Sequence, residues 1–371
     1  MLRENICICA TSITRWKKTH RKSKSVLKSA DSEDRGKMVP KRNRGRDFLN
    51  TMEICEMPDF KMLTLDDGPI IKKYKEDMKI SDMEFTQLYA WQENFHNRYK
   101  IIDGYFCALY QRDDGSCSCY APLGTYEKDR YNSALMKLKK ELEEHGLPFR
   151  FDFVPEDWLI RFAVLPGYKA YMDCNENFSD YIYDAEDFLC LKGNANEHKR
   201  YLVNYFKKHY NYEYRCLNEE NRDDAYKVME NWCREKDCED CYWGCEKRSV
   251  FKILEAWQAF DCKGAVVYVD GAAKAFMIGE QISHDMVVSH FQKADKHVKG
   301  LYAYLSNEFY TREYPGIKYI NLQEDMGIPA LRDSKMSYRP CHMLHKYTVT
   351  LRGKRGKAYE KTTDLKRVYK K

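Results

Sequence analysis

Two polar segments in the second half of the chain hold residue types that can catalyse group transfer. His290 lies near the end of one apolar run, and Glu324 and Asp325 follow another. A histidine there could act as a general base or donate to an oxyanion, and a carboxylate could orient an acceptor amine. Lys335 and Tyr338 could stabilise the charge of a tetrahedral intermediate as a cation and a hydroxyl. These five residues are the expected catalytic group.

Each of the five also has a purely structural interpretation. His290 could be a buried histidine whose ring bridges a strand and a helix. Glu324 and Asp325 could instead charge the N-terminus of a short helix that begins near Pro329. The lysine could lie on a solvated helix face, and the tyrosine could serve packing alone. Both interpretations stay open at the level of sequence.

A second concentration of reactive side chains is the spacing C-x4-C-x2-C-x3-C, formed by Cys233, Cys238, Cys241 and Cys245. One C-x2-C pair is a metal knuckle, whereas the usual zinc site has two such pairs or paired histidines. Zinc binding by these four cysteines is therefore one hypothesis. Reduced thiols in a loop are the alternative.

The elements that must position these residues follow one plan in both halves of the chain. In the first half, a helix over 131–142 is indicated by apolar residues at helical spacing and is stopped by Gly146. Around it, the patterns predict strands at 99–110, 116–120, 149–154, 168–172 and 181–183, with a short helix at 155–162.

The second half repeats this order after a connecting helix over 197–209. Apolar stripes indicate two helices, around 225–232 and 250–257, and Asp270-Gly271 is typical of a tight hairpin turn. The remaining elements are predicted as strands at 265–269, 275–282, 286–291, 317–322 and 344–351, with helices at 301–311 and from Pro329. A repeat of about 150 residues indicates a duplicated domain and not a solenoid.

This order of elements resembles the acetyltransferase (GNAT) fold, and a tandem of two is similar to the Fem-type aminoacyltransferases. More closely, residues 52–352 resemble the family (DUF2156) related to the C-terminal domain of phosphatidylglycerol lysyltransferase. The matching segments are HFQKAD at 290–295, GLY at 300–302, NLQEDMGIP at 321–329 and KMSYRP at 335–340. The expected fold is therefore α/β (α+β), with two tandem GNAT-like domains and mixed central sheets.

The resemblance also implies a reaction. It implies transfer of an aminoacyl group from aminoacyl-tRNA to an amine or hydroxyl acceptor, on a lipid met at a membrane surface or on a small molecule. The alternatives are a CoA-dependent N-acyltransferase and a non-catalytic binding module. The residues that the resemblance places at the substrate are Phe291, Lys293, Gly300, Asn321 and Arg332.

One departure from the acetyltransferase pattern concerns the donor. Acetyl-CoA enzymes of this fold carry a Gln/Arg-x-x-Gly-x-Gly/Ala turn after the central strand, and its backbone N–H groups bind pyrophosphate. Residues 292–300 here have no early glycine, and Asp295 would repel phosphate. Coenzyme A is thereby disfavoured. Binding of tRNA would be supported if six cations lined one cleft: Lys293, Lys296, Lys299, Lys318, Arg332 and Lys335.

The charge of the chain is unevenly distributed. Residues 1–50 hold 14 Lys and Arg against 5 Asp and Glu, so that the other residues carry −3 of the net +6. We expect a disordered basic tail at 1–51, domains at 52–212 and 213–352, and a basic C-terminal tail at 353–371. Apolar runs near ~18 residues and a secretory signal are missing from the sequence, which predicts a cytoplasmic protein with reduced cysteines.

Overall fold

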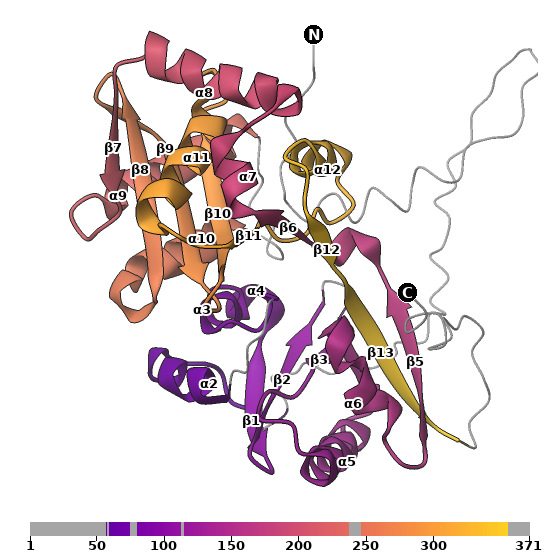
Figure 1. Cartoon of the computed structure of the whole chain (residues 1–371). Coiled ribbons are helices and arrows are strands. Elements are labelled where there is room, and N and C mark those ends of the chain that lie inside the picture. Colours follow the sequence, from indigo (N-terminus) through magenta and orange to yellow (C-terminus); the bar gives the residue numbers. More distant parts are fainter. Residues whose placement is uncertain (1–56, 58, 75–79, 113–114, 237–245, 355–371) are drawn as a thin grey trace, which may run out of the picture.

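The computed structural model describes residues 57, 59–74, 80–112, 115–236 and 246–354. Within these residues the strands form two mixed sheets, one of six strands and one of seven (Figure 1). The six-stranded sheet has the order β1-β2-β3-β4-β13-β5, and the seven-stranded sheet has the order β12-β6-β11-β10-β9-β8-β7.

The strands of the six-stranded sheet are β1 (Arg98–Ile102), β2 (Tyr105–Gln111), β3 (Cys117–Tyr120), β4 (Arg150–Pro155), β5 (Tyr168–Cys174) and β13 (Lys346–Gly353). Those of the seven-stranded sheet are β6 (Asp180–Asp184), β7 (Tyr212–Cys216), β8 (Cys262–Val269), β9 (Ala272–Gln281), β10 (Met286–Ala294), β11 (Tyr319–Asn321) and β12 (His342–Leu344). The helices around the first sheet are α2 (Gly68–Tyr74), α3 (Phe85–Ala90), α4 (Gln92–Phe95), α5 (Lys128–Glu144) and α6 (Leu159–Ala163). Those around the second sheet are α7 (Ala185–Cys190), α8 (Glu197–His209), α9 (Arg222–Glu235), α10 (Glu246–Glu255), α11 (Leu301–Glu313) and α12 (Pro329–Met336). Short 3-10 turns include η3 (Glu156–Trp158).

Each sheet is built around one parallel pair of strands joined by a crossover helix. In the first sheet β3 runs parallel to β4 and the crossover is α5, whereas in the second β10 runs parallel to β11 and the crossover is α11. The pairing of β10 with β11 ends at Val288 and Asn321, although β10 continues to Ala294 alongside β9. The two central strands therefore separate beyond this point. The polar segment after β11 leaves the sheet there, whereas residues 290–294 remain in β10.

The two halves exchange one strand each. β6 precedes α7 in the chain but lies between β11 and β12 of the second sheet, and β13 lies between β4 and β5 of the first. Figure 1 shows β13 in yellow, running from the junction of the halves into the lower sheet. The expected boundary between residues 212 and 213 thus does not coincide with the division between the sheets. Neither sheet is complete without a strand from the other half of the sequence.

Buried side chains cover the second sheet on both faces. Along β8, Ala265 and Val267 face the core beneath α11, and Val266 and Tyr268 face the core beneath α9 and α10. The core beneath α9 and α10 continues into the first half of the chain, where the ring of Phe85 lies 5.6 Å from that of Phe260, measured between centroids. The two halves are therefore joined by a shared apolar core as well as by the exchanged strands. Both faces of the second sheet are apolar because helices cover both of them.

Three local features differ from the expectation. The strand expected over 99–110 is a hairpin of β1 and β2, because Asp103 and Gly104 adopt left-handed φ angles of 50° and 77°. The strand expected over 344–351 is two strands in different sheets, divided at His345. β7 at the edge of the second sheet was not expected at all. For the β1–β2 hairpin, the dipeptide Asp103-Gly104 was a turn signal in the sequence, but the apolar run around it obscured that signal.

Gly300 has a packing role, which gives a first prediction. Its φ is 87°, and a Cβ atom there would lie 2.2 Å from the carbonyl oxygen of Leu202 on α8. We expect Gly300→Ala to lower the free energy of unfolding by about 2–5 kcal/mol, through backbone strain and displacement of the helix. Urea denaturation measures this loss.

The matched control is Gly271→Ala in the β8–β9 turn, where φ is 78° and no atom lies within 4 Å of the added Cβ. It should lose only the strain of about 1–2 kcal/mol. Equal losses in the two variants would show that the contact between Gly300 and α8 contributes nothing.

Candidate functional site

Asn321, the last residue of β11, begins the site. Its side chain is fully buried, its Nδ2 donates to Asp180 Oδ2 at 2.9 Å, and its Oδ1 accepts from the Gln323 amide at 2.7 Å. A buried amide must find partners for both ends, and here the partners are the exchanged strand β6 and the turn after β11. Asn321 therefore fixes where the following carboxylates lie.

Three carboxylates surround one buried lysine at this position, and we call them with the lysine the Lys346 cluster. Lys346 Nζ lies 2.8 Å from Asp180 Oδ1, 2.9 Å from Asp82 Oδ2 and 3.2 Å from Glu324 Oε2. The side chains of Lys346 and Asp180 are 1% and 0% exposed, whereas those of Asp82 and Glu324 are 14% and 23% exposed. The cluster thus has a closed base and a rim that solvent reaches.

The strand exchange is what assembles the cluster. Asp180 and Lys346 are the first residues of the exchanged strands β6 and β13, and Ser179 Oγ lies 3.0 Å from His345 Nδ1 just before them. Asp82 comes from the turn ahead of α3, which is tied to the segment after β11 by a 2.8 Å hydrogen bond from Gln323 Nε2 to Ser81 Oγ. Both halves of the sequence therefore contribute to the cluster.

The carboxylates of the cluster differ in acidity. Burial, reinforced by Asp180 and Glu324 and opposed by Lys346, raises the pKa of Asp82 to about 7. Burial likewise raises the pKa of Asp180. Burial acts in the same sense on Glu324, but Lys346 and then Lys335 outweigh it and lower the pKa of that carboxyl. One carboxyl can thus exchange a proton near neutral pH while its neighbour stays ionised.

Lys335 braces the turn that carries Glu324. Its Nζ donates to the carbonyl oxygens of Leu322 at 2.6 Å and Gln323 at 3.2 Å, and also to that of Glu324. Gln323 needs this support, because its φ is 59°. Burial lowers the pKa of Lys335 to about 8. The expected role in stabilising an intermediate is not what this geometry provides, since all three N–H groups point to the backbone.

Asp325 and Arg332 form a second pair beside the cluster. Arg332 Nε and Nη2 reach the two carboxylate oxygens at 2.7 and 3.0 Å, and Tyr181 donates its hydroxyl to Oδ2. Burial acts to raise the pKa of Asp325, but the hydrogen bonds from Arg332 and Tyr181, with that from the Gly327 amide, outweigh it and lower that pKa. The Gly327 amide donates to the same carboxylate at 2.7 Å. Asp325 therefore holds the start of α12 in place, as the structural interpretation proposed.

His290 has a different partner from these groups. Its side chain has no exposed surface, and its Nε2 lies 2.9 Å from Glu280 Oε2 on β9. The neighbouring Phe291 is buried against Trp91 of the first half, with ring centroids 6.4 Å apart. The described contacts join His290 to Glu280 and Glu324 to Lys346, and the pairing of His290 with Glu324 as base and carboxylate stays a prediction.

The backbone amides after β10 are already occupied. His297 N donates to Asp295 Oδ1 at 2.9 Å, Val298 N to the Asp295 carbonyl at 3.2 Å, and Lys299 N to the Tyr210 hydroxyl at 3.2 Å. In an acetyl-CoA enzyme, amides at this position bind pyrophosphate. Here an aspartate takes the place of the anion, and α8 packs over the same turn through Gly300.

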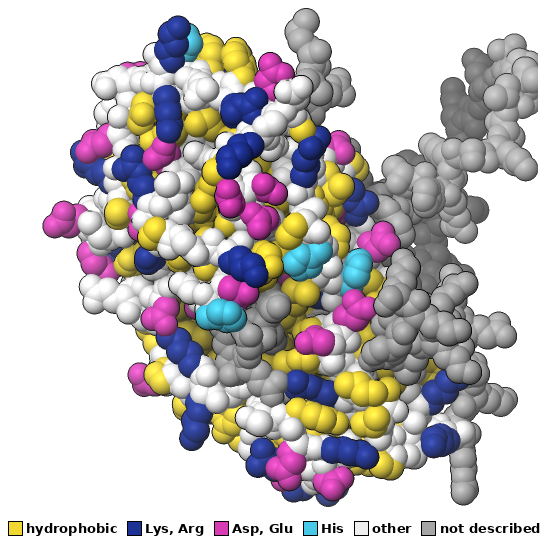
Figure 2. Space-filling model, viewed as in Figure 1, with side chains coloured by type: hydrophobic (Ala, Val, Ile, Leu, Met, Phe, Trp, Pro, Cys, Tyr) yellow, Lys and Arg dark blue, Asp and Glu magenta, His cyan; other side chains and the backbone are white. Residues whose placement is uncertain are grey.

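The six cations named for a tRNA cleft do not gather. Lys293 is buried and pairs with Glu246 of α10 at 2.8 Å, whereas Lys318 precedes β11 at the end opposite to Arg332 and Lys335. Lys296 pairs with Glu235 at 3.5 Å. On the face seen in Figure 2, basic and acidic side chains alternate over both halves. The arrangement of these six residues that would have supported tRNA binding is therefore not formed.

Two further expectations concern packing and metal. Tyr338 stacks on Phe188 with centroids 4.6 Å apart, and Lys199 Nζ lies 3.8 Å from the centre of the Tyr338 ring, which favours the packing interpretation.

Of the cysteine series only Cys233 is described, as a partly buried thiol on α9. Cys238, Cys241 and Cys245 lie outside the described residues, so their zinc hypothesis stays a prediction.

Asp82, Asp180 and Lys346 were missed by the sequence analysis. Lys346 was the most visible of them, because it is a single cation next to the alternating strand residues Tyr347, Val349 and Leu351. A buried charge in a strand normally has an ionic partner. Asp82 and Asp180 have no comparable signal.

The chain is similar to proteins of one family over most of its length. The family model for the C-terminal domain of phosphatidylglycerol lysyltransferase matches residues 76–350. A conserved protein of unknown function from Bacteroides thetaiotaomicron superposes with a TM-score of 0.73 at 26% identity, over 79% of this chain and 99% of that chain. No curated protein gives a significant sequence match.

More distant structures share the fold. The C-terminal domain (DUF2156) of a putative lysylphosphatidylglycerol synthetase from Agrobacterium fabrum has a TM-score of 0.57 at 13% identity, over 77% of this chain and 90% of that one. FemX has a TM-score of 0.53 at 11% identity, over 78% and 96% of the two chains. The expected tandem GNAT-like architecture is thereby confirmed. In the part of the chain that the structure describes, every helix is too short or too polar to cross a bilayer.

Proposed function

Because the chain belongs to the family of the phosphatidylglycerol lysyltransferase C-terminal domain, we propose that it transfers an aminoacyl group from aminoacyl-tRNA to an acceptor. The acceptor would be an amine or hydroxyl on a lipid or a small molecule. Family and fold support acyl transfer in general. The observation that carries the choice of an aminoacyl donor is the excess of negative charge in the Lys346 cluster.

The cluster suits a cationic substrate group. Three carboxylates surround a single ammonium, and the two at the rim, Asp82 and Glu324, keep part of their surface exposed. An aminoacyl ester carries a free α-ammonium, which these carboxylates would bind, whereas an acetyl thioester has no such group. Charge-assisted hydrogen bonds of this kind are about twice as strong as neutral ones.

The difference in acidity assigns the roles. Glu324, whose pKa is lowered, stays charged and would hold the α-ammonium. Asp82, whose pKa is raised to about 7, would act as the general base. Lys346 keeps both carboxylates in place from below, and Lys335 with Asn321 positions the turn that carries Glu324.

The proposed reaction moves the aminoacyl group from the ribose oxygen of the tRNA to the acceptor. The acceptor nitrogen or oxygen attacks the carbonyl carbon of the aminoacyl ester, and its proton passes to Asp82. The bond between the carbonyl carbon and the ribose oxygen of the tRNA then breaks, and that oxygen leaves with the proton that Asp82 returns to it. The products are the aminoacylated acceptor and uncharged tRNA.

A test against the coenzyme A alternative follows from the occupied amides. We expect acetyl-CoA and longer acyl-CoAs to leave the melting temperature unchanged, because Asp295 fills the pyrophosphate position. A ligand at 100 times its dissociation constant would add about 2.7 kcal/mol of stability, which thermal denaturation detects easily. An increase in melting temperature with an acyl-CoA would instead favour the hypothesis of a CoA-dependent N-acyltransferase. Excess free CoA-binding protein should abolish that increase.

The direct experiment incubates the full chain with a mixture of charged tRNAs and follows the loss of each aminoacyl ester, with anionic lipid vesicles or small amines as acceptors. We expect ester loss that depends on the acceptor and is reduced at least tenfold by Glu324→Gln. Binding of charged tRNA without ester loss would instead favour a non-catalytic module. The absence of both would reject the proposal.

A further inference from the structure

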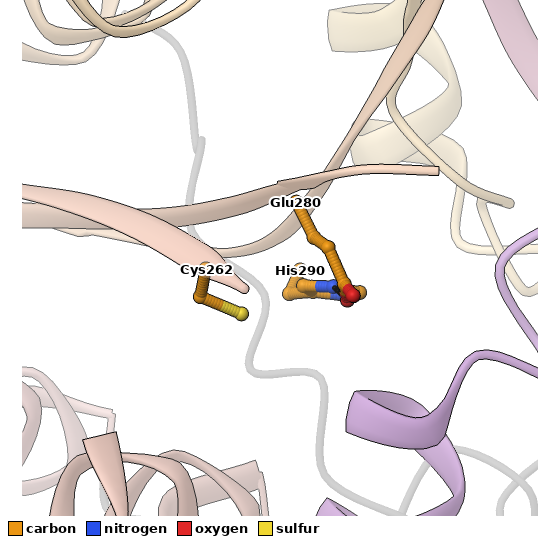
Figure 3. Close-up of side chains that lie close together, drawn as sticks. All are labelled: Cys262, Glu280 and His290. Atoms are coloured by element: carbon orange, nitrogen blue, oxygen red, sulfur yellow. Dashed lines mark hydrogen bonds and ion pairs between the residues drawn. The ribbon is translucent and has the colours of Figure 1, made fainter. Parts of the chain in front are cut away.

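Three side chains with metal-binding atoms, none of them a member of the Lys346 cluster, meet on one face of the seven-stranded sheet. They are Cys262 on β8, Glu280 on β9 and His290 on β10, and their ligand atoms all lie within 4.8 Å of one another (Figure 3). His290 Nε2 and Glu280 Oε2 are 2.9 Å apart. Figure 3 shows the thiol and the carboxylate both directed towards the imidazole.

Strand register explains why the three residues share a face. Cys262 and Glu280 are direct partners across β8 and β9, so their side chains point to the same side. β10 has a bulge between Ser289 and Phe291, where His290 is the extra residue. The bulge lets His290 and Phe291, although adjacent, both face the first half of the chain. β-Bulges commonly re-aim a side chain in this way.

The imidazole of His290 is only half satisfied. The side chain is completely buried, and its Nδ1 has no hydrogen-bond partner among the described residues. A buried polar atom without a partner costs about 1–3 kcal/mol, so this histidine is not a fully satisfied structural residue.

A small cavity borders Glu280, one of the three residues. A cavity of about 160 Å³ is lined by Glu280 itself, by Asp261 beside Cys262, and by Phe85 of α3. It has room for water, so water can reach the Glu280 side of the group. Three protein ligands with one open position is a common zinc arrangement.

From these observations we propose that Cys262, Glu280 and His290 bind a divalent transition-metal ion, and that zinc fits the site best. The combination of thiolate, imidazole and carboxylate matches the ligand preferences of zinc, whereas magnesium and calcium prefer oxygen alone. Ligand atoms in a tetrahedral zinc site lie about 3–4 Å apart, so small side-chain movements would close this one. The ion would fix three strands where α3, which follows the turn with Asp82, packs on them: Thr86 Oγ1 is 3.9 Å from Cys262 Sγ.

The test loads the full chain, purified under reducing conditions, with zinc or cobalt and removes unbound metal by desalting. We expect about one equivalent of metal to be lost in Cys262→Ser and in His290→Gln, relative to the unsubstituted chain. Cobalt bound at this site should show thiolate charge-transfer absorption with the intensity of a single Co–S bond. Cys190→Ser, which removes an exposed thiol, is the matched control and should keep its metal.

The double variant Cys238→Ser/Cys241→Ser separates this site from the cysteine series. If that variant loses the metal while Cys262→Ser and His290→Gln keep it, the ion belongs to the cysteine series and the proposal is overturned. Failure of the unsubstituted chain to retain either metal overturns it as well. Should Cys262→Ser not fold, the cobalt spectrum of the unsubstituted chain decides, since several thiolates would give a proportionally stronger band.

Discussion

Asp82→Asn should lower kcat/KM for aminoacyl transfer at least a hundredfold while the protein stays folded. General-base catalysis by a positioned side chain typically contributes about 10²–10⁴-fold, and asparagine keeps the size of the side chain but cannot take a proton. The amide can still accept a hydrogen bond from Lys346, which lies 2.9 Å from the carboxylate. Initial rates with the charged tRNA found to react measure the effect.

The pH dependence gives a second readout of the same group. Because the pKa of Asp82 is raised to about 7, the rate should rise with pH through that value as the base loses its proton. Stability should change in the opposite direction. The folded protein holds the proton of Asp82 more tightly than the unfolded chain does. The contribution of this group to the free energy of unfolding is therefore complete at low pH and is lost as pH rises towards 7. Both dependences should be absent in Asp82→Asn.

The matched control is Asp157→Asn, which changes an exposed carboxylate of η3 in the first half. Its rate and pH profile should equal those of the unsubstituted chain. An Asp82 variant with full activity, or a rate limb near pH 7 that survives the substitution, would remove Asp82 from the role of base.

Lys346→Met should lower the free energy of unfolding by about 3–5 kcal/mol at pH 7, because removing one partner leaves buried charge uncompensated. Asp180 and Lys346 are almost completely buried, and two more carboxylates face the same ammonium. Methionine fills much of the lysine volume, so that the loss reports charge and not a cavity. Urea denaturation of both proteins gives the difference.

Two comparisons identify the origin of that loss. The deficit of Lys346→Met should shrink as pH falls and the carboxylates become protonated. Lys346→Met/Asp180→Asn should recover part of it, as a double-mutant cycle of a direct ion pair requires. A loss below about 1 kcal/mol, the range of exposed pairs, would mean that water reaches the cluster and that it does not hold the two exchanged strands.

The order of helices and strands was accessible from the sequence because it depends on short-range patterns. Apolar residues at helical spacing located α5 and α11, and alternation located most strands, including those of the parallel pairs. The repeated order indicated two similar halves. The exchange of β6 and β13 was not accessible, because a strand has the same alternation whichever sheet it enters.

The candidate site, too, has one part that the sequence indicated and another that only the tertiary structure decided. The segment after β11, with Asn321 and Glu324, is local in sequence, and its polar residues after an apolar run marked it by themselves. The partners of Glu324 were decided only by the tertiary structure: Lys346 comes from an exchanged strand, and its ion pair with Asp82 joins residues 264 positions apart. Attraction between charges depends on distance in space and on burial, neither of which a sequence pattern of a few residues contains. His290 is a further case, a residue whose type suggested a base and whose burial and contact with Glu280 only the tertiary structure decided.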